Sequence, residues 1–112
     1  MVWFKVDDQL HTHPRWLQLS ARGKALWTSA GSWCSFNLTD GHVPSYALSM
    51  LQAKPADARE LVRSGLWHEH PEDGWMFHDW AEYQPSRDKV IEKREKAKKR
   101  MAELRANLDG GS

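Results

Sequence analysis

The sequence predicts an α+β fold, mainly α, in which one small domain is followed by a long basic helix. The first observation is the order of signals between residues 40 and 80, where two short helices with apolar stripes precede two short strands. The second is the type of residue at the expected helix ends, since Pro44 and Pro55 each suit a first helical turn and Gly65 suits a left-handed C-terminal cap. The third is the turn sequence Pro-Glu-Asp-Gly at residues 71–74. Helix, turn, helix and hairpin in this order predict a winged helix-turn-helix.

The N-terminal third of the chain is expected to supply a lead-in and the longest helix of the domain. Residues 3–6 suit a short strand or an extended segment, residues 11–14 a turn, and residues 15–19 a single helical turn with Trp16 and Leu19 inward. Ser20 is a good N-cap for a helix that runs from Ala21 to about residue 36. We expect another element to approach the backbone closely at Gly31. The apolar residues at helical spacing that predict the buried stripe are Leu26, Trp27, Ala30, Trp33 and Cys34.

The middle of the chain is expected to carry the helix pair and the hairpin. The first helix should run from Pro44 to about residue 52, and the second should occupy residues 55–64. One strand should start at Leu66, and the returning strand should alternate from Trp75 through Asp79, with residues 42–43 as a third strand. The predicted core is Trp27, Ala30, Trp33, Leu48, Leu51, Leu61, Val62, Leu66, Trp67 and Phe77, with Trp3, Phe4, Trp80 and Tyr83 over its ends.

The C-terminal part divides into three stretches. Residues 81–85 should form an ordered connection that completes a winged-helix domain spanning residues 1–85. Ser86 should cap a helix that continues to about residue 107, so that residues 86–108 form the basic helix. Residues 109–112 are expected to be a flexible tail or linker, and this ending is typical of a cut chain or a linker rather than of a natural domain edge.

The composition indicates an intracellular protein. The single Cys34 excludes an internal disulfide, which fits a reducing compartment such as the cytoplasm of a bacterial host. No apolar run approaches the roughly 20 residues of a membrane span, and Lys5, Asp7 and Asp8 interrupt any signal-peptide pattern. Seven tryptophans in 112 residues are expected to supply core bulk between short elements. We therefore expect no membrane association.

Charge is distributed unevenly along the chain. The net charge is +1, yet residues 87–105 contain nine basic and four acidic residues, which gives this segment +5 and leaves −4 for the rest. A near-neutral total would argue against a nucleic-acid partner, but this segregation of charge favours one.

Several motifs resemble a family of small proteins from phages and prophages of actinobacteria. The stretches that carry the resemblance are WFKVDD (3–8), LHTHP (10–14), AGSWC (30–34), LTDG (38–41), GLW (65–67) and FHDWAEYQPS (77–86). Members are described as helix-turn-helix or replication-initiation proteins and are similar to the N-terminal winged-helix domain of DnaD-type replisome organisers. The resemblance implies a winged-helix fold and a DNA-associated role, and it implies no catalytic residue.

In the DNA-binding interpretation, the second helix of the pair enters the major groove. Its solvent face is expected to show Lys54, Asp57, Arg59, Glu60 and Arg63, which sum to +1. The expected wing is acidic through Glu69, Glu72 and Asp73, and both features also favour a protein-interaction module. The candidate DNA-contacting residues in this region are Ser45, Lys54, Arg59 and Arg63.

The last helix has three interpretations. It can be a phosphate-binding arm that contacts duplex DNA through Lys93, Arg94, Lys96, Lys98, Lys99 and Arg100. It can be a solvated charged helix with pairs at four-residue spacing, Glu92 with Lys96 and Glu95 with Lys99. It can also dimerise through a short heptad seam in which Arg94 takes one core position, made by Val90, Ala97, Met101, Leu104 and Leu108.

Metal and catalytic motifs are missing from the sequence. His11 with His13, and His68 with His70, are two residues apart, yet no Cys-x-x-Cys or His-Glu-x-x-His is present, so no metal and no cofactor are expected. Cys34 should be an inert buried thiol, and an enzyme is not expected. The leading hypothesis is a DNA-binding protein of phage or prophage replication. The alternatives are a protein-interaction or oligomerisation module, for example with replication proteins or a second copy, and a transcriptional regulator.

Overall fold

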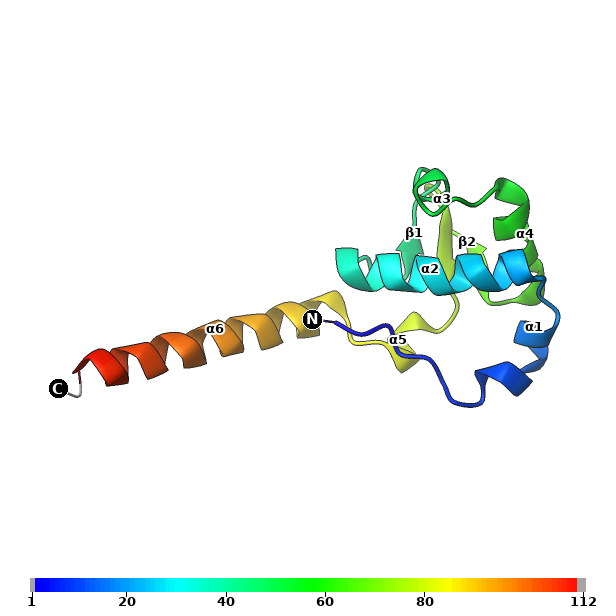
Figure 1. Cartoon of the computed structure of the whole chain (residues 1–112). Helices are drawn as coiled ribbons and strands as arrows, with labels where there is room; N and C mark the ends of the chain where they lie inside the picture. The colour runs from blue at the N-terminus through cyan, green and yellow to red at the C-terminus, as the bar shows by residue number, and fades with distance from the viewer. Residues whose placement is uncertain (1, 111–112) are drawn as a thin grey trace.

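The longest helix of the body, α2 (Ala21–Asn37), lies across the domain, and the other elements pack around it (Figure 1). The computed structural model describes residues 2–110. The predicted cap is confirmed, because the Ser20 Oγ accepts a hydrogen bond from the Gly23 N–H at 3.2 Å. The helix ends where Leu38 adopts a left-handed conformation with φ of 54°.

A small antiparallel sheet packs against α2. Its strands are β1 (His42–Val43), β2 (Trp67–Glu69) and β3 (Trp75–Phe77), in the order β1-β3-β2. The predicted third strand at residues 42–43 is confirmed, with His42 opposite Met76. The prediction that the returning strand continues through Asp79 is wrong, since the chain leaves the sheet after Phe77. Asp79 has a φ of 56° and turns the chain into the short helix α5 (Trp80–Tyr83).

The two helices of the predicted pair differ in how well the sequence defined them. The second, α4 (Pro55–Ser64), has the predicted bounds, and Gly65 caps it with a φ of 85°. The first, α3 (Ala47–Met50), is shorter than the predicted 44–52. The Ala47 N–H donates to the Pro44 carbonyl and the Leu48 N–H to the Ser45 carbonyl, which forms tight turns before it, and Gln52 ends the segment with a φ of 58°.

The N-terminal segment passes from the start of the last helix to α2. Residues 3–6 are extended and join no sheet, which is one of the two predicted forms. They are followed by η1 (Leu10–Thr12), a 3-10 helix, and by α1 (Pro14–Leu17). The Phe4 ring lies directly on Gly31, so the expected close approach at this glycine is confirmed.

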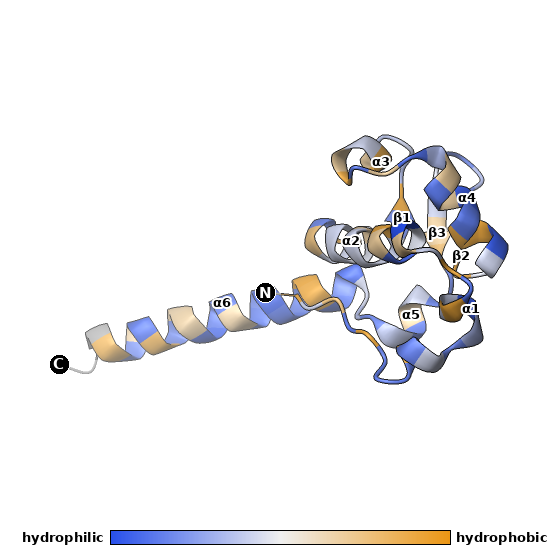
Figure 2. Cartoon of the chain, turned by 45° about the vertical axis from the view of Figure 1, so that its right-hand side comes forward, coloured by the Kyte–Doolittle hydropathy of each residue, from blue (hydrophilic) through white to orange (hydrophobic). Residues whose placement is uncertain are grey.

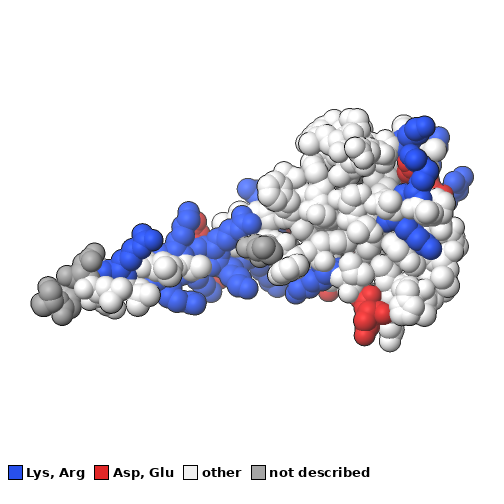
Figure 3. Space-filling view, viewed as in Figure 1, with Lys and Arg blue, Asp and Glu red and all other residues white. Residues whose placement is uncertain are grey.

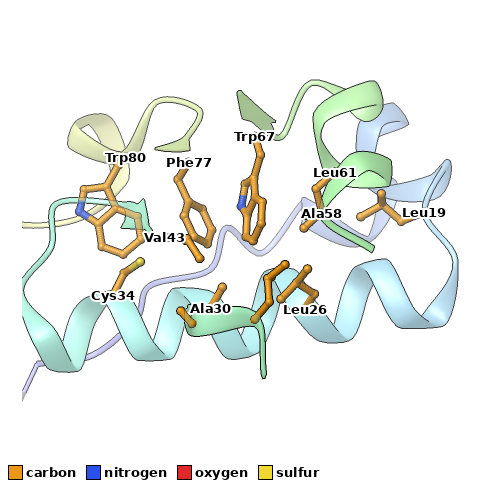
Figure 4. Close-up of a cluster of buried hydrophobic side chains, with 12 residues drawn as sticks. Leu19, Leu26, Ala30, Cys34, Val43, Ala58, Leu61, Trp67, Phe77 and Trp80 are labelled. Carbon is orange, nitrogen blue, oxygen red and sulfur yellow. The ribbon is translucent and has the colours of Figure 1, made fainter. Parts of the chain in front are cut away.

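The core lies between α2, α4 and the sheet (Figure 4). Of the predicted core, five residues are buried: Ala30, Leu48, Leu61, Trp67 and Phe77. The other five are half-buried and pack against them: Trp27, Trp33, Leu51, Val62 and Leu66. The buried hydrophobic residues outside that predicted list are Leu19, Leu26, Cys34, Val43, Ala47, Ala58, Trp80 and Val90. Trp80 was expected only to cover an end of the core, yet it is 8% exposed.

The last helix, α6 (Arg87–Gly110), projects from the body (Figure 1). Ser86 caps it as predicted, through the Lys89 N–H at 3.2 Å, and the Asp40 carboxylate accepts a hydrogen bond from the Arg87 N–H at 2.7 Å. The helix runs to Gly110, past its predicted end at about residue 107; residues 111–112 of the expected tail lie outside the described residues. Figure 2 shows that most of α6 beyond its first turns is polar.

Candidate nucleic-acid interface

The two exposed charged side chains of α4 are cations, whereas its two acids are buried or half-buried. Arg59 and Arg63 are exposed and one helical turn apart, so they lie on the same face. Lys54, directly before the helix, is exposed as well. These are three of the four residues predicted to contact DNA in this region.

Asp57 does not lie on that solvent face, which corrects the sequence-based expectation. Its carboxylate is buried, with a side chain 11% exposed, and accepts two hydrogen bonds from Arg22 of α2. The Arg22 Nε lies 3.1 Å from Oδ1 and Nη2 lies 2.9 Å from Oδ2. The Lys54 N–H also donates to Oδ2 at 2.9 Å, which satisfies one N–H at the start of α4. The hydrogen bonds from Arg22 and then from Lys54 hold the pKa of Asp57 below its ordinary value.

Glu60 is also turned towards α2. Its Oε1 accepts hydrogen bonds from the Ser20 N–H at 2.8 Å and the Ser20 hydroxyl at 2.9 Å. Both acids of α4 are therefore bonded to the first turn of α2, because helix α4 packs its acidic side against the N-terminal end of that helix, where a helix dipole favours negative charge.

The result is a basic patch at this end of the molecule, which we call the α4 patch: Arg22, Lys54, Arg59 and Arg63. Figure 3 shows lysine and arginine side chains gathered over the end where α4 and the start of α2 lie. Arg22 was missed by sequence reasoning because its partner is 35 residues away. Asp57 could have been found, since it stands three residues after Lys54 at the N3 position of a capping box.

The hairpin between β2 and β3 is held by an acid that was expected to repel DNA. Asp73 accepts a hydrogen bond from the Ser45 N–H at 3.0 Å, and bonds to Ser45 lower its pKa. Ser45, predicted to contact DNA, is thus bonded to the hairpin, although it remains exposed. Glu69 and Glu72 are exposed, so the hairpin offers an acidic surface.

The predicted cations of the last helix remain available to solvent. We call them the α6 arm: Lys93, Arg94, Lys96, Lys98, Lys99 and Arg100, all exposed. Lys96 forms the predicted pair with Glu92 at 3.0 Å. In the described part of α6, the pair of Glu95 with Lys99 does not form, so five of these six side chains have no ion pair there.

The predicted dimerisation seam is split by the structure. Val90 is 7% exposed and packs on its own domain, so it is not on the free part of the helix. Met101, Leu104 and Leu108 are exposed, at 51%, 53% and 73%, and Ala97 is exposed beside them. The free seam therefore begins at Ala97, within the arm, and continues past it to Leu108.

The α4 patch and the α6 arm lie at opposite ends of the molecule (Figures 1 and 3). The longest extent of the chain is 63 Å. In the view of Figure 3 the surface between them carries few charged side chains. A single straight ligand that touches both must therefore run along most of the molecule.

The remaining polar residues form no arrangement typical of a metal centre. Within residues 2–110, no group of three or more His, Cys, Asp and Glu side chains is placed to hold a metal ion. His42 stacks on His70 at 4.1 Å, and His78 pairs with Asp79 at 3.0 Å. Cys34 is fully buried, as predicted, and burial raises the pKa of its thiol to about 11. No described helix combines the length and the apolar character that crossing a membrane requires.

Comparisons of the chain with models of protein families, with curated proteins and with solved structures found no match. The geometry of the α4 patch and the α6 arm therefore carries the functional argument.

Proposed function

We propose that the protein binds duplex DNA as a winged-helix protein, with α4 as the helix that enters the major groove. What supports the fold assignment is the order of elements, in which α2, β1, α3, α4, β2 and β3 follow one another and the hairpin of β2 and β3 would be the wing. The resemblance to phage and prophage proteins favours a role in replication initiation or organisation. A transcriptional regulator would use the same contacts at a defined operator.

The observation that carries the proposal is the inward orientation of both acids of α4. Asp57 is bonded to Arg22 and Glu60 to Ser20, so neither carboxylate opposes a phosphate at the exposed face. Arg59 and Arg63 remain on that face. Arginine at a helix surface can contact both guanine edges and phosphates, which makes these two residues the expected centre of the interface.

The α6 arm would add affinity without sequence preference. Its exposed cations lie around one helix, and each phosphate that they neutralise releases counterions from the duplex. The longest extent of the molecule is 63 Å and the arm ends before the end of α6, so a straight duplex that contacts both clusters would span at most about 18 base pairs.

Duplex length therefore tests the proposal together with salt dependence. We expect a duplex of about 24 base pairs to bind more tightly than one of about 10, and with a steeper salt dependence, because only the longer one reaches both clusters. Fluorescence anisotropy between about 50 and 200 mM salt gives both quantities.

Neutralising the α4 patch tests the role of α4. The double change Arg59→Gln with Arg63→Gln should weaken binding and reduce the slope of log affinity against log salt by about 1–2, since each lost phosphate contact removes about 0.9. The matched control is Arg87→Gln with Lys89→Gln, which removes two exposed cations outside both clusters. Equal binding by both double variants, or no binding of any duplex at low salt, would contradict the proposal.

A protein-interaction module is the second candidate, and a specific surface favours it. Three large apolar side chains, near the C-terminal end of α2, directly before α3 and at the end of α3, are exposed: Phe36 at 82%, and Tyr46 and Met50 at 63% each. Exposed apolar groups of this size are typical of contact surfaces when they gather. Cross-linking would identify a protein partner. If Phe36→Ser abolishes cross-linking to that partner and leaves DNA binding intact, the protein-interaction function is supported and both functions coexist.

A further inference from the structure

A cavity of about 380 Å³ lies between the N-terminal segment and the body of the domain. Residues from Phe4 to Arg15 form one side, and the other side comes from α2, the sheet and α5. In Figure 1 this segment is the blue loop that leaves the body near α5 and returns to α2 through α1. The volume of the cavity is within the range of about 300–1,000 Å³ that is typical of small-molecule sites.

One part of the cavity wall is aromatic. Phe4, Trp27, Phe77 and Trp80 line it and fix one another, with the Phe4 and Trp80 rings stacked at 5.9 Å and an interplanar angle of 13°. Phe4 also lies 5.1 Å from Trp27 between ring centroids. Such a rigid aromatic wall suits a flat, apolar ligand, since stacked and edge contacts add to the burial of apolar area.

The segment that closes the cavity is anchored at both ends, and between them its hydrogen bonds are local except for one from the Arg15 side chain to the Gly65 carbonyl. At one end, the Gln84 side chain accepts from the Lys5 N–H at 3.0 Å and donates to the Lys5 carbonyl at 2.6 Å. At the other end, Leu19 is buried in the core. The hydrogen bonds of Asp7, Gln9 and Thr12 stay within the segment. This loop can therefore adjust to a ligand without breaking the sheet or α2.

The cavity is lined by both acidic and basic side chains. Each of the two carboxylates has one local partner: Asp7 Oδ1 accepts from the Gln9 N–H at 2.9 Å, and Asp79 Oδ2 lies 3.0 Å from the His78 Nε2. The His13 Nδ1 accepts from the Arg15 N–H at 3.2 Å, so in the neutral ring its Nε2 carries the proton and is a donor.

The cationic donors, by contrast, are largely unused. Within residues 2–110, neither Lys5 nor Arg15 forms a salt bridge. The Arg15 guanidinium gives one of its five N–H groups to the Gly65 carbonyl at 3.3 Å, which leaves four for another acceptor. The cavity thus combines an aromatic wall with unpaired donors and cations.

We infer that this cavity binds a small aromatic carboxylate, with its ring system against Phe4, Trp27, Phe77 and Trp80 and its carboxylate at Arg15. Lys5 and His13 supply the further donors at the same cavity. Arg15 holds the anion best because a planar guanidinium can donate two parallel hydrogen bonds to a carboxylate. This site is separate from the α4 patch and the α6 arm, and its existence does not depend on DNA binding.

Two probes of the same shape test the inference on the full chain. 2-Naphthoate carries the carboxylate, and 2-naphthylmethanol replaces it by a neutral group. By calorimetry, we expect the carboxylate to bind about tenfold or more tightly than the alcohol, because a hydrogen bond to a charged group contributes that much. In a nitrogen-correlated NMR spectrum, the indole N–H signals of Trp27 and Trp80 should move, while signals of α6 should stay.

Three variants separate the carboxylate contact from general changes. Arg15→Gln should remove the preference for the carboxylate and leave binding of the alcohol unchanged. Arg105→Gln, which removes an exposed arginine of α6 away from the cavity, should change neither affinity. Leu10→Trp fills the cavity from the closing segment and should weaken both probes, with circular dichroism to verify the fold.

The inference is overturned if neither probe binds, or if the two bind equally and Arg15→Gln has no effect. It is equally overturned if the shifted signals lie at Phe36, Tyr46 and Met50, because the probe would then report a surface patch. A peptide that binds at the cavity in preference to both probes would identify a protein partner instead and would also contradict it.

Discussion

The guanidinium of Arg22 makes two parallel hydrogen bonds to the carboxylate of Asp57, at 3.1 and 2.9 Å. This pair joins the first turn of α2 to the first turn of α4 and removes an acid from the exposed face of α4. The same pair therefore links α4 to α2 and reduces the negative charge that α4 presents. It is the contact on which the proposed interface depends most directly.

Asp57→Ala should destabilise the fold by about 1–3 kcal/mol at neutral pH, because it removes a helix cap and leaves Arg22 unpaired. The pKa of Asp57 is lowered in the folded state, so its contribution is complete above the unfolded value of about 3.8 and is lost as the pH falls through the folded pKa. Denaturant unfolding from pH 7 down to pH 3 should show the difference between the variant and the native chain shrinking at the acidic end.

The control for this series is Asp88→Ala, which changes an exposed carboxylate in the first turn of α6. Its effect should be small at every pH. If Asp57→Ala lowers the free energy of unfolding by the same amount down to the lowest pH, the stabilisation does not depend on the charge of the carboxylate.

Charge reversal in the α6 arm should weaken duplex binding strongly. The change of Lys96, Lys98, Lys99 and Arg100 to Glu removes four exposed cations and adds four acids, so both the affinity at low salt and the salt slope should fall. Anisotropy titration measures both. The opposite change, Glu95→Gln with Glu103→Gln, removes two negative charges and should strengthen binding. If neither variant changes the affinity for the duplex, the arm is not part of the interface.

Gly31→Ala should displace Phe4 from the body. A Cβ at this position meets the Phe4 ring, and overpacking of this kind costs about 1–3 kcal/mol, more than the roughly 1 kcal/mol of helix propensity gained. Thermal unfolding should show a lower midpoint. Ser32→Ala, on the exposed side of the same helix, has no such contact and should leave the midpoint unchanged or slightly raised.

Self-association through α6 should depend on the exposed part of the seam. If two copies pair there, light scattering at increasing concentration detects a dimer, and Leu104→Lys shifts it to monomer with the unfolding midpoint unchanged, because Leu104 is 53% exposed. Val90→Ala should do the reverse, lowering stability without changing association, since Val90 packs on its own domain. If the protein stays a monomer at every concentration, the exposed seam does not mediate self-association, and DNA binding by the arm is the one proposed role of α6 that remains.

Cys34 should be unreactive in the folded protein. Its side chain is fully buried and burial raises the pKa of the thiol to about 11, so almost no thiolate exists at pH 8. A chromogenic disulfide reagent should react slowly with the native chain and rapidly after unfolding in guanidinium chloride. Fast labelling of the native chain would mean that α2 opens locally near its C-terminal end.

The sequence by itself determined the elements whose signals are local. Ser20 and Ser86 were recognisable caps, and Pro55 with Gly65 marked both ends of α4, because capping and left-handed conformations depend on residues within one turn. The apolar stripe of α2 predicted its buried side, and the turn at 71–74 predicted a hairpin.

Other features were decided only by tertiary structure. The inward position of Asp57 and Glu60 comes from packing of α4 on α2, which lies 35 to 40 residues away in sequence, so no local pattern contains it. The shortening of α3 and β3 follows from turns at Gln52 and Asp79 that the apolar pattern does not encode. The cavity under the N-terminal segment exists because Lys5 and Gln84, 79 positions apart, are hydrogen-bonded at its edge. Long-range contacts of this kind fix where charges and voids lie, and therefore what the surface can bind.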